Sequence, residues 1–156
     1  MGQLLYPDRD AAASLFRAQV ENLYVEAMVL ADEAYAALAG GREPPGTRAD
    51  NVERVALACE SLKTTTRLMH VIAWLLHQRA IMAGEPGASD KDSAAQLGDP
   101  LAADKALVPC FDPLVQRIVR DSERLFDRVK RLDSEWRTQR RVLPVHAMLS
   151  ELQARL

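Results

Sequence analysis

The residues that could act as general bases or metal ligands are few and widely spaced. The sequence contains three histidines, His70, His77 and His146. On a helix His70 and His77 would share one face but lie about 10 Å apart, because seven residues make two turns. That separation is too large for both imidazoles to bind one metal ion without ligands from elsewhere. No serine-hydrolase elbow and no His-Glu-x-x-His motif occurs, so the sequence predicts no catalytic site, no metal site and no cofactor.

Two further features resemble chemical motifs without meeting their requirements. The segment 41–47, GREPPGT, has the glycine spacing of a phosphate-binding loop, but it lacks the lysine and follows a predicted helix instead of a strand. Cys59 and Cys110 are the only cysteines, and they form no Cys-x-x-Cys pair. We therefore expect a turn at 41–47 and two reduced thiols.

One line of polar residues is the strongest candidate for recognition. Its members alternate spacings of three and four, which places them on one helix face: Glu60, Lys63, Arg67, His70, Trp74 and His77. Such a face is either solvated, with the indole tucked under long side chains, or a docking surface, because Trp and Arg are enriched at interface hot spots. Arg67 or Arg79 could instead pair with acids of the first helix. The candidate partner-binding residues are Glu60, Lys63, Arg67, His70, Trp74, His77, Gln78 and Arg79.

Three long segments position these residues. In each, apolar residues recur in threes and fours between helix-starting and helix-ending signals, which predicts α-helices at 10–39, 49–83 and 113–140. The expected core of the first helix is Phe16, Val20, Leu23, Ala27, Leu30, Ala34 and Ala37, and that of the third is Leu114, Ile118, Leu125, Val129, Leu132 and Trp136. The expected core stripe of the second is Val52, Val55, Cys59, Leu62, Thr66, Met69, Ala73, Leu76 and Ala80, with a neighbouring stripe of Ala58, Leu68, Ile72, Leu75 and Met82.

The fold class that follows is all-α: a single domain over residues 1–156, with three helices packed antiparallel in a bundle. Residues 85–111 are rich in Gly, Pro, Ser and Asp and predict a long irregular connection between the second and third helices. Pro144 is expected to end the third helix and to leave a short amphipathic tail at 142–156. The first two helices each carry two adjacent apolar stripes, and this surplus of apolar surface predicts a homodimer.

Charge and hydropathy narrow the function classes. The chain has 20 Lys and Arg against 22 Asp and Glu, a net charge of −2, which removes the overall attraction expected of a nucleic-acid or anionic-membrane binder. No apolar stretch is long enough to cross a bilayer, and acids stand where a signal peptide would be basic, so the sequence predicts a cytoplasmic protein. The first helix is acidic and the third basic; we expect two solvated faces with modest mutual attraction.

The second predicted helix closely resembles the signature of a known family. Residues 60–80 read ESLKTTTRLMHVIAWLLHQRA, similar to the approximate pattern ESMRLTTRLMQxASWLLxQRA of the RcdA family, the alphaproteobacterial regulators of CtrA degradation. The matching positions are Glu60, Ser61, Thr65, Thr66, Arg67, Leu68, Met69, Trp74, Leu75, Leu76, Gln78, Arg79 and Ala80. Residues 23–33 and 122–133 carry weaker similarities to other parts of the family pattern. Lys63 and Ala73 depart from it.

The resemblance implies a non-enzymatic role. Family members are helical-bundle proteins, often dimeric, that help deliver substrates to the ClpXP protease during cell-cycle control. Their implied partners are the protease complex, response regulators and substrate proteins. The alternative is a structural or scaffolding homodimer with no link to a protease.

Overall fold

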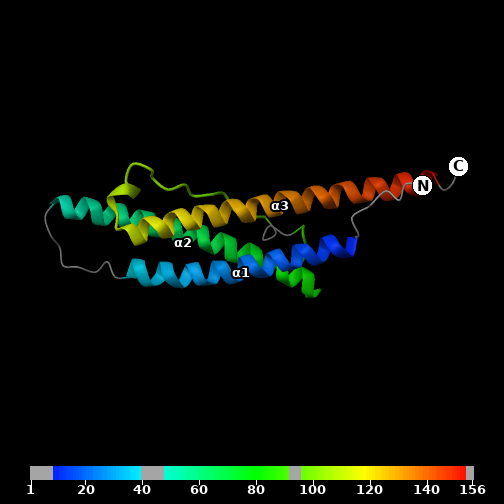
Figure 1. Ribbon diagram of the computed structural model, residues 1–156, viewed down its shortest axis with the longest axis horizontal. Coiled ribbons are helices and arrows are strands. Elements are labelled where there is room, and N and C mark those ends of the chain that lie inside the picture. The colour runs from blue at the N-terminus through cyan, green and yellow to red at the C-terminus, as the bar shows by residue number, and fades with distance from the viewer. Residues whose placement is uncertain (1–8, 40–47, 92–95, 154–156) are drawn as a thin grey trace.

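The computed structural model describes residues 9–39, 48–91 and 96–153 and contains three long α-helices: α1 (Arg9–Ala39), α2 (Arg48–Ala83) and α3 (Pro113–Gln153). The three helices lie side by side along most of their length (Figure 1). One short 3₁₀ turn, Val108–Cys110, precedes α3. In the described ranges no residue lies in a strand. The prediction of an all-α three-helix bundle is confirmed; the predicted turn at 41–47 lies outside the described residues.

A shared apolar core holds the helices together. Its largest fully buried members include Trp74, Phe126, Leu75, Ile118 and Leu125. At one end the ring of Phe16 stacks on that of Trp136, with centroids 4.1 Å apart. Of the core residues expected of α1, all but the last are buried, and Ala37 is half-buried; the buried ones are Phe16, Val20, Leu23, Ala27, Leu30 and Ala34. In α3 the expected stripe is also buried, apart from its first residue, Leu114, which is exposed, and its last, Trp136, which is half-buried.

The directions of the helices differ from the prediction. Two ion pairs show the register of α1 against α3: Arg128 to Glu26 and Arg117 to Glu33. The numbering rises along α3 as it falls along α1, so these two helices are antiparallel. Figure 1 shows α1 running against α2 as well, so α2 and α3 are parallel. The expectation that all three pack antiparallel is therefore wrong for the α2 and α3 pair.

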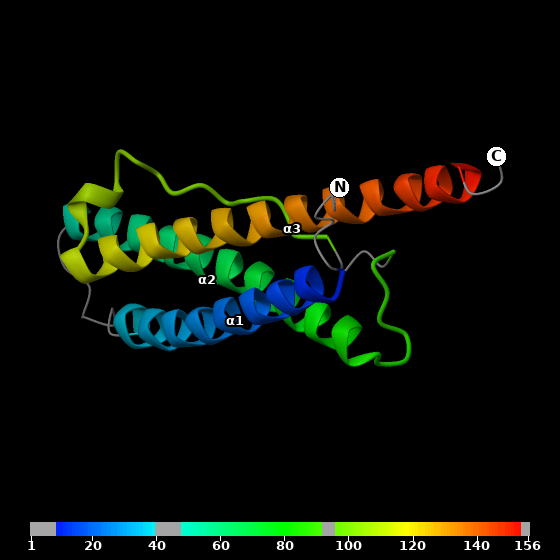
Figure 2. The ribbon, with the colours of Figure 1, turned by 45° about the vertical axis from the view of Figure 1, so that its right-hand side comes forward.

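The long connection explains this arrangement. Parallel neighbours need a segment that returns along the whole bundle, and Figure 2 shows the described part of the connection running back beside α3. Gly84, with φ of 69°, ends α2 in the left-handed conformation, and its N–H donates to the carbonyl of Ile81. At the other end the Asp112 carboxylate accepts the N–H of Leu114 at 2.8 Å, and Pro113 opens α3. Outside the 3₁₀ turn the connection is irregular in its described part, as predicted.

The end of α3 corrects a second expectation. The helix was expected to stop at residue 140 with a short tail at 142–156, but it continues through Pro144 to Gln153. A proline inside a helix removes one backbone hydrogen bond, and the ring crowds the preceding turn, which costs about 3 kcal/mol. The helix nevertheless continues for nine residues after the proline. Pro144 therefore interrupts the hydrogen-bond ladder without ending the helix.

We expect the ion pairs between α1 and α3 to contribute little to stability. In the Arg117 to Glu33 pair the two side chains are 47% and 42% exposed, and their atoms lie 3.0 Å apart. Water screens such pairs, so a double-mutant cycle with Arg117→Ala and Glu33→Ala should give a coupling below about 1 kcal/mol in urea unfolding. A coupling above about 2 kcal/mol would show that charge, and not the apolar core, fixes the register.

Candidate functional site

The predicted recognition line on α2 lies inside the fold. Four of the eight candidate partner-binding residues are almost fully buried, with exposed fractions of 3% or less: Glu60, Arg67, Trp74 and Gln78. The other four candidates are half-buried: Lys63, His70, His77 and Arg79. The line is therefore neither a solvated face nor a free docking surface in this conformation. The reason is that α3 and the connection both cover this side of α2, and periodicity alone places neither of them.

Arg67 is the centre of this buried arrangement. Its Nε and Nη2 both donate to the carbonyl of Leu101, at 3.0 and 2.6 Å. Its Nη1 donates to the hydroxyl of Ser122 and, at 3.5 Å, to the carbonyl of Val119. The carboxylate of Glu60 lies 3.6 Å from Nη2. One guanidinium thus joins α2, α3 and the connection.

We call residues 97–104 of the connection the strap, and Glu60, Arg67 and Glu123 the seat. Besides the bonds from the guanidinium, Glu60 accepts the N–H of Asp104 at 3.3 Å and Glu123 accepts the N–H of Ala103 at 2.8 Å. Burial lowers the pKa of Arg67, and the charges of Glu123 and Glu60 act in the opposite direction. The seat therefore recognises backbone groups of the strap by means of three charged side chains.

The buried side of α2 also carries polar atoms without a hydrogen-bond partner among the described residues. They are Glu60 Oε1, Thr64 Oγ1, His70 Nδ1 and Trp74 Nε1. The imidazole of His70 lies against the strap so closely that a Cβ on Gly98 would be 2.7 Å from its Nδ1. The ring of His77 contacts an earlier part of the connection, with Nε2 3.0 Å from the carbonyl of Ser89. Both histidines thus contact the connection and are only partly exposed to solvent.

Arg79 contacts two residues of α1. Its guanidinium pairs with Glu21 at 2.8 Å and lies over the ring of Tyr24, 4.5 Å from the centroid. An internal pairing of Arg79 with an acid of the first helix was one of the predicted uses. Arg67 instead pairs with Glu60 of its own helix.

The stripe expected to form the core of α2 faces outward. We call it the outward seam: Val52, Val55, Cys59, Leu62, Thr66, Met69, Ala73, Leu76 and Ala80. Val55, Leu62 and Met69 are 64%, 69% and 63% exposed. The expectation that this stripe is core is wrong, because α2 is apolar on two sides and the neighbouring stripe, with Leu68 and Leu75, is the one that faces α1 and α3.

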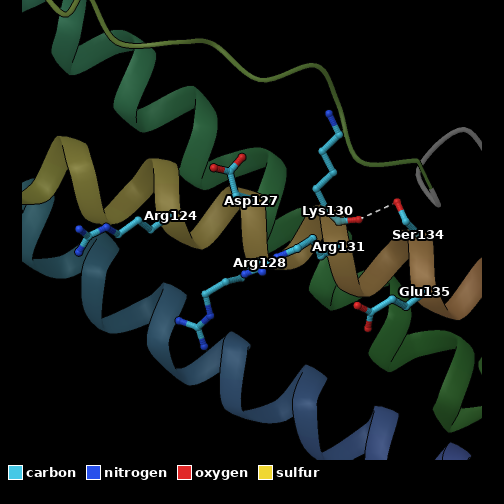
Figure 3. A pocket seen from close by; sticks show the side chains of 7 residues that line it. All are labelled: Arg124, Asp127, Arg128, Lys130, Arg131, Ser134 and Glu135. Atoms are coloured by element: carbon cyan, nitrogen blue, oxygen red, sulfur yellow. Dashed lines mark hydrogen bonds between the residues drawn. The ribbon is translucent and has the colours of Figure 1, made fainter.

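A surface hollow of about 830 Å³ lies on α3 (Figure 3). Its lining mixes four basic residues with two acids and a serine: Arg124, Asp127, Arg128, Lys130, Arg131, Ser134 and Glu135. Figure 3 shows the guanidinium of Arg128 directed toward α1 and the ammonium of Lys130 directed away from it. These cations do not converge on one point, so the hollow is not a built site for a small anion.

The described residues offer no candidate metal centre. Among them no group of three or more His, Cys, Asp or Glu lies together in a way that could hold an ion. None of the described helices has the length and apolar character needed to cross a membrane.

Comparison with known proteins places the chain in one family. No curated protein and no solved structure matches it. A family model described as "Protein of unknown function (DUF1465)" matches residues 11–156. This match covers α2, α3, the strap, the seat and all but the first two residues of α1, and the chain therefore belongs to the DUF1465 family.

Proposed function

We propose that this protein is a non-enzymatic protein-interaction module, an adaptor that assists ClpXP-dependent degradation of cell-cycle regulators in the cytoplasm. We also propose that the outward seam of α2 is its main contact surface and that a second copy of the chain occupies it. The observation that carries the proposal is the exposure of this seam along the helix.

The seam has the composition of an interface. Between Arg54 and Arg79 the Asp, Glu, Lys and Arg residues of α2 are Glu60, Lys63 and Arg67, and all three lie on the covered side. The outward side of that stretch therefore carries none of these four residue types. A continuous exposed apolar row of this kind is typical of a surface that another molecule covers. Here the bundle covers one side only, which leaves the other for a partner.

The spacing of the seam favours a second helix of the same kind. Val55, Leu62, Met69 and Leu76 follow one another at intervals of seven, and the intervening seam residues complete a three-four repeat. A repeat of seven keeps one stripe in contact with a partner helix over several turns, about 40 Å along the helix for residues 52–80. Two copies related by a two-fold axis would present identical, self-complementary stripes. This supports a homodimer through α2.

The adaptor role is supported by family membership and by the motif in residues 60–80. RcdA-like proteins belong to the DUF1465 family, and the motif of this chain resembles theirs. On this basis the partners are the protease complex, response regulators and substrate proteins. The second candidate function is a scaffolding homodimer without a protease link, which the outward seam supports equally well.

A charge in the seam tests the contact surface. Met69→Glu should convert a species of twice the 17.3 kDa chain mass into one of 17.3 kDa in light scattering at micromolar concentration, because a carboxylate would be buried unpaired in the interface. The matched control is Val25→Glu, since Val25 is similarly exposed at 60% but lies on α1. It should leave the mass unchanged. A wild-type mass of 17.3 kDa would rule out the homodimer.

The same variants separate the two functions. Tagged wild-type chain and the Val25→Glu control should co-purify protease subunits and response regulators from a native alphaproteobacterial lysate, and Met69→Glu should lose them. A dimeric wild-type protein that recovers none of these proteins would favour the scaffolding homodimer and contradict the adaptor role.

A further inference from the structure

The strap is held in a way that does not depend on its own side chains. The seat contacts the carbonyl of Leu101 and the N–H groups of Ala103 and Asp104. Every extended segment of polypeptide presents carbonyl and N–H groups of this kind. The seat therefore selects a backbone conformation more than a sequence.

The strap itself contributes little apolar contact. The side chain of Leu101 is 40% exposed, and Asp99, Pro100 and Ala102 are also exposed. Leu97 is the one large apolar side chain of the strap that packs against the core. A segment with so few buried apolar contacts belongs to the least stable part of a fold.

Simple release of the strap is nevertheless unfavourable. Arg67 is 1% exposed and Glu60 is 2% exposed, and without the strap the guanidinium would lose two of its hydrogen bonds in a poorly solvated place. A replacement segment that offers the same carbonyl and N–H groups removes this cost. Exchange of one segment for another is therefore much easier than opening alone.

We propose that the seat is a binding site for an extended peptide segment of a partner protein, which the strap fills in the free chain and which the partner's segment fills by exchange. This site is separate from the outward seam, and the inference holds whether or not the chain dimerises. The unpartnered atoms Trp74 Nε1, Thr64 Oγ1 and His70 Nδ1 lie on the same buried side of α2. A partner's segment that reaches one of them gains a hydrogen bond that the strap does not make.

The chemistry of the partner's segment follows from the strap. It needs a glycine where Gly98 faces the His70 ring, because a side chain there would come within 2.7 Å of Nδ1. An apolar residue precedes this glycine, in the position of Leu97, and the carbonyl that meets Arg67 follows three positions later. Polar or apolar side chains fit the exposed positions between them.

Gly98→Ala provides a way to release the strap without altering the seat. Gly98 does not have a positive φ, so the effect of the added methyl group is the clash with His70. In hydrogen exchange followed by NMR, the amides of Ala103 and Asp104 should lose at least about tenfold of their protection. The double variant Gly98→Ala/His70→Ala should regain it, because the clashing ring is gone. Leu97→Asp, which removes the apolar anchor, should give the same loss with an unchanged helix content.

Peptide binding tests the exchange. A fluorescent synthetic peptide of residues 96–107 should bind the Gly98→Ala chain at least about tenfold more tightly than wild type in fluorescence polarisation, because the tethered strap no longer competes at a high effective concentration. The matched control is the same peptide with alanine in the glycine position, which should bind about tenfold more weakly. The proposal is overturned if the two amides lose protection in Gly98→Ala and Leu97→Asp but neither chain binds the peptide. It is also overturned if neither variant releases the strap.

Discussion

Replacing Arg67 with methionine should lower the free energy of unfolding by about 3–5 kcal/mol, the range found when one partner of a buried ion pair is removed. The substitution keeps most of the side-chain volume but leaves the Glu60 carboxylate, which is 2% exposed, without its buried cation and with only the half-buried Lys63 nearby. It also removes both donors from the carbonyl of Leu101 and one from the hydroxyl of Ser122. The variant thus loses the guanidinium that joins α2, α3 and the connection. Urea unfolding at fixed protein concentration measures the difference.

Lys63 supplies the matched control for this experiment. It also approaches Glu60, at 3.7 Å, but its side chain is 36% exposed. Because water can replace its ammonium, Lys63→Met should cost less than about 1 kcal/mol. If Arg67→Met costs no more than Lys63→Met, then the strap and the seat do not contribute to the stability of the bundle.

The contrast between α1 and α2 shows how far the sequence predicts the core. In α1 the stripe through Val20 and Ala27 is buried as expected, although Val25 and Val29 on the other side of the helix are also apolar and are exposed. In α2 the residues on both sides of the helix are apolar, so two stripes have the right period and the stripe through Leu62 and Met69 was expected to be core. The spacing of the apolar residues identifies a helix face that can be buried. Which of two such faces is covered depends on where the other helices pack.

The direction of α3 and the position of the strap are two further features that local sequence patterns do not predict. Composition indicates that residues 85–111 are irregular, but not that they run back along the bundle and make α2 parallel to α3. Because the strap lies over Arg67, the polar recognition line of α2, whose composition is typical of an exposed face, is largely buried. Spacing placed Glu60 and Arg67, the two seat residues of α2, on one helix face, and the structure brings both to the strap. Spacing missed Glu123 and Ser122, because the signal for a seat is a long-range contact that no local pattern contains.

Trp74→Ala should be as damaging as the loss of the guanidinium, whereas Trp74→Phe should be nearly harmless. Trp74 is 1% exposed and is among the largest fully buried side chains of the core. Truncation of a buried tryptophan to alanine leaves a cavity and costs about 3–5 kcal/mol. The indole Nε1 has no hydrogen-bond partner in the described part of the chain, so phenylalanine removes no hydrogen bond. It also relieves the cost of burying an unpaired N–H, about 1–3 kcal/mol, which offsets the smaller ring.

Because Trp74→Phe preserves the fold, it also separates packing from recognition. If Trp74 only fills the core, the free energy of unfolding of Trp74→Phe should lie within about 1.5 kcal/mol of wild type. In chains that also carry Gly98→Ala, the phenylalanine substitution should then leave the affinity for the peptide of residues 96–107 unchanged. If the indole N–H donates to the incoming segment, the same variant should remain stable but bind that peptide several-fold more weakly, since one hydrogen bond contributes about 1 kcal/mol. Loss of stability in Trp74→Phe comparable to that in Trp74→Ala would contradict both outcomes and would mean that the indole N–H has a partner inside the fold.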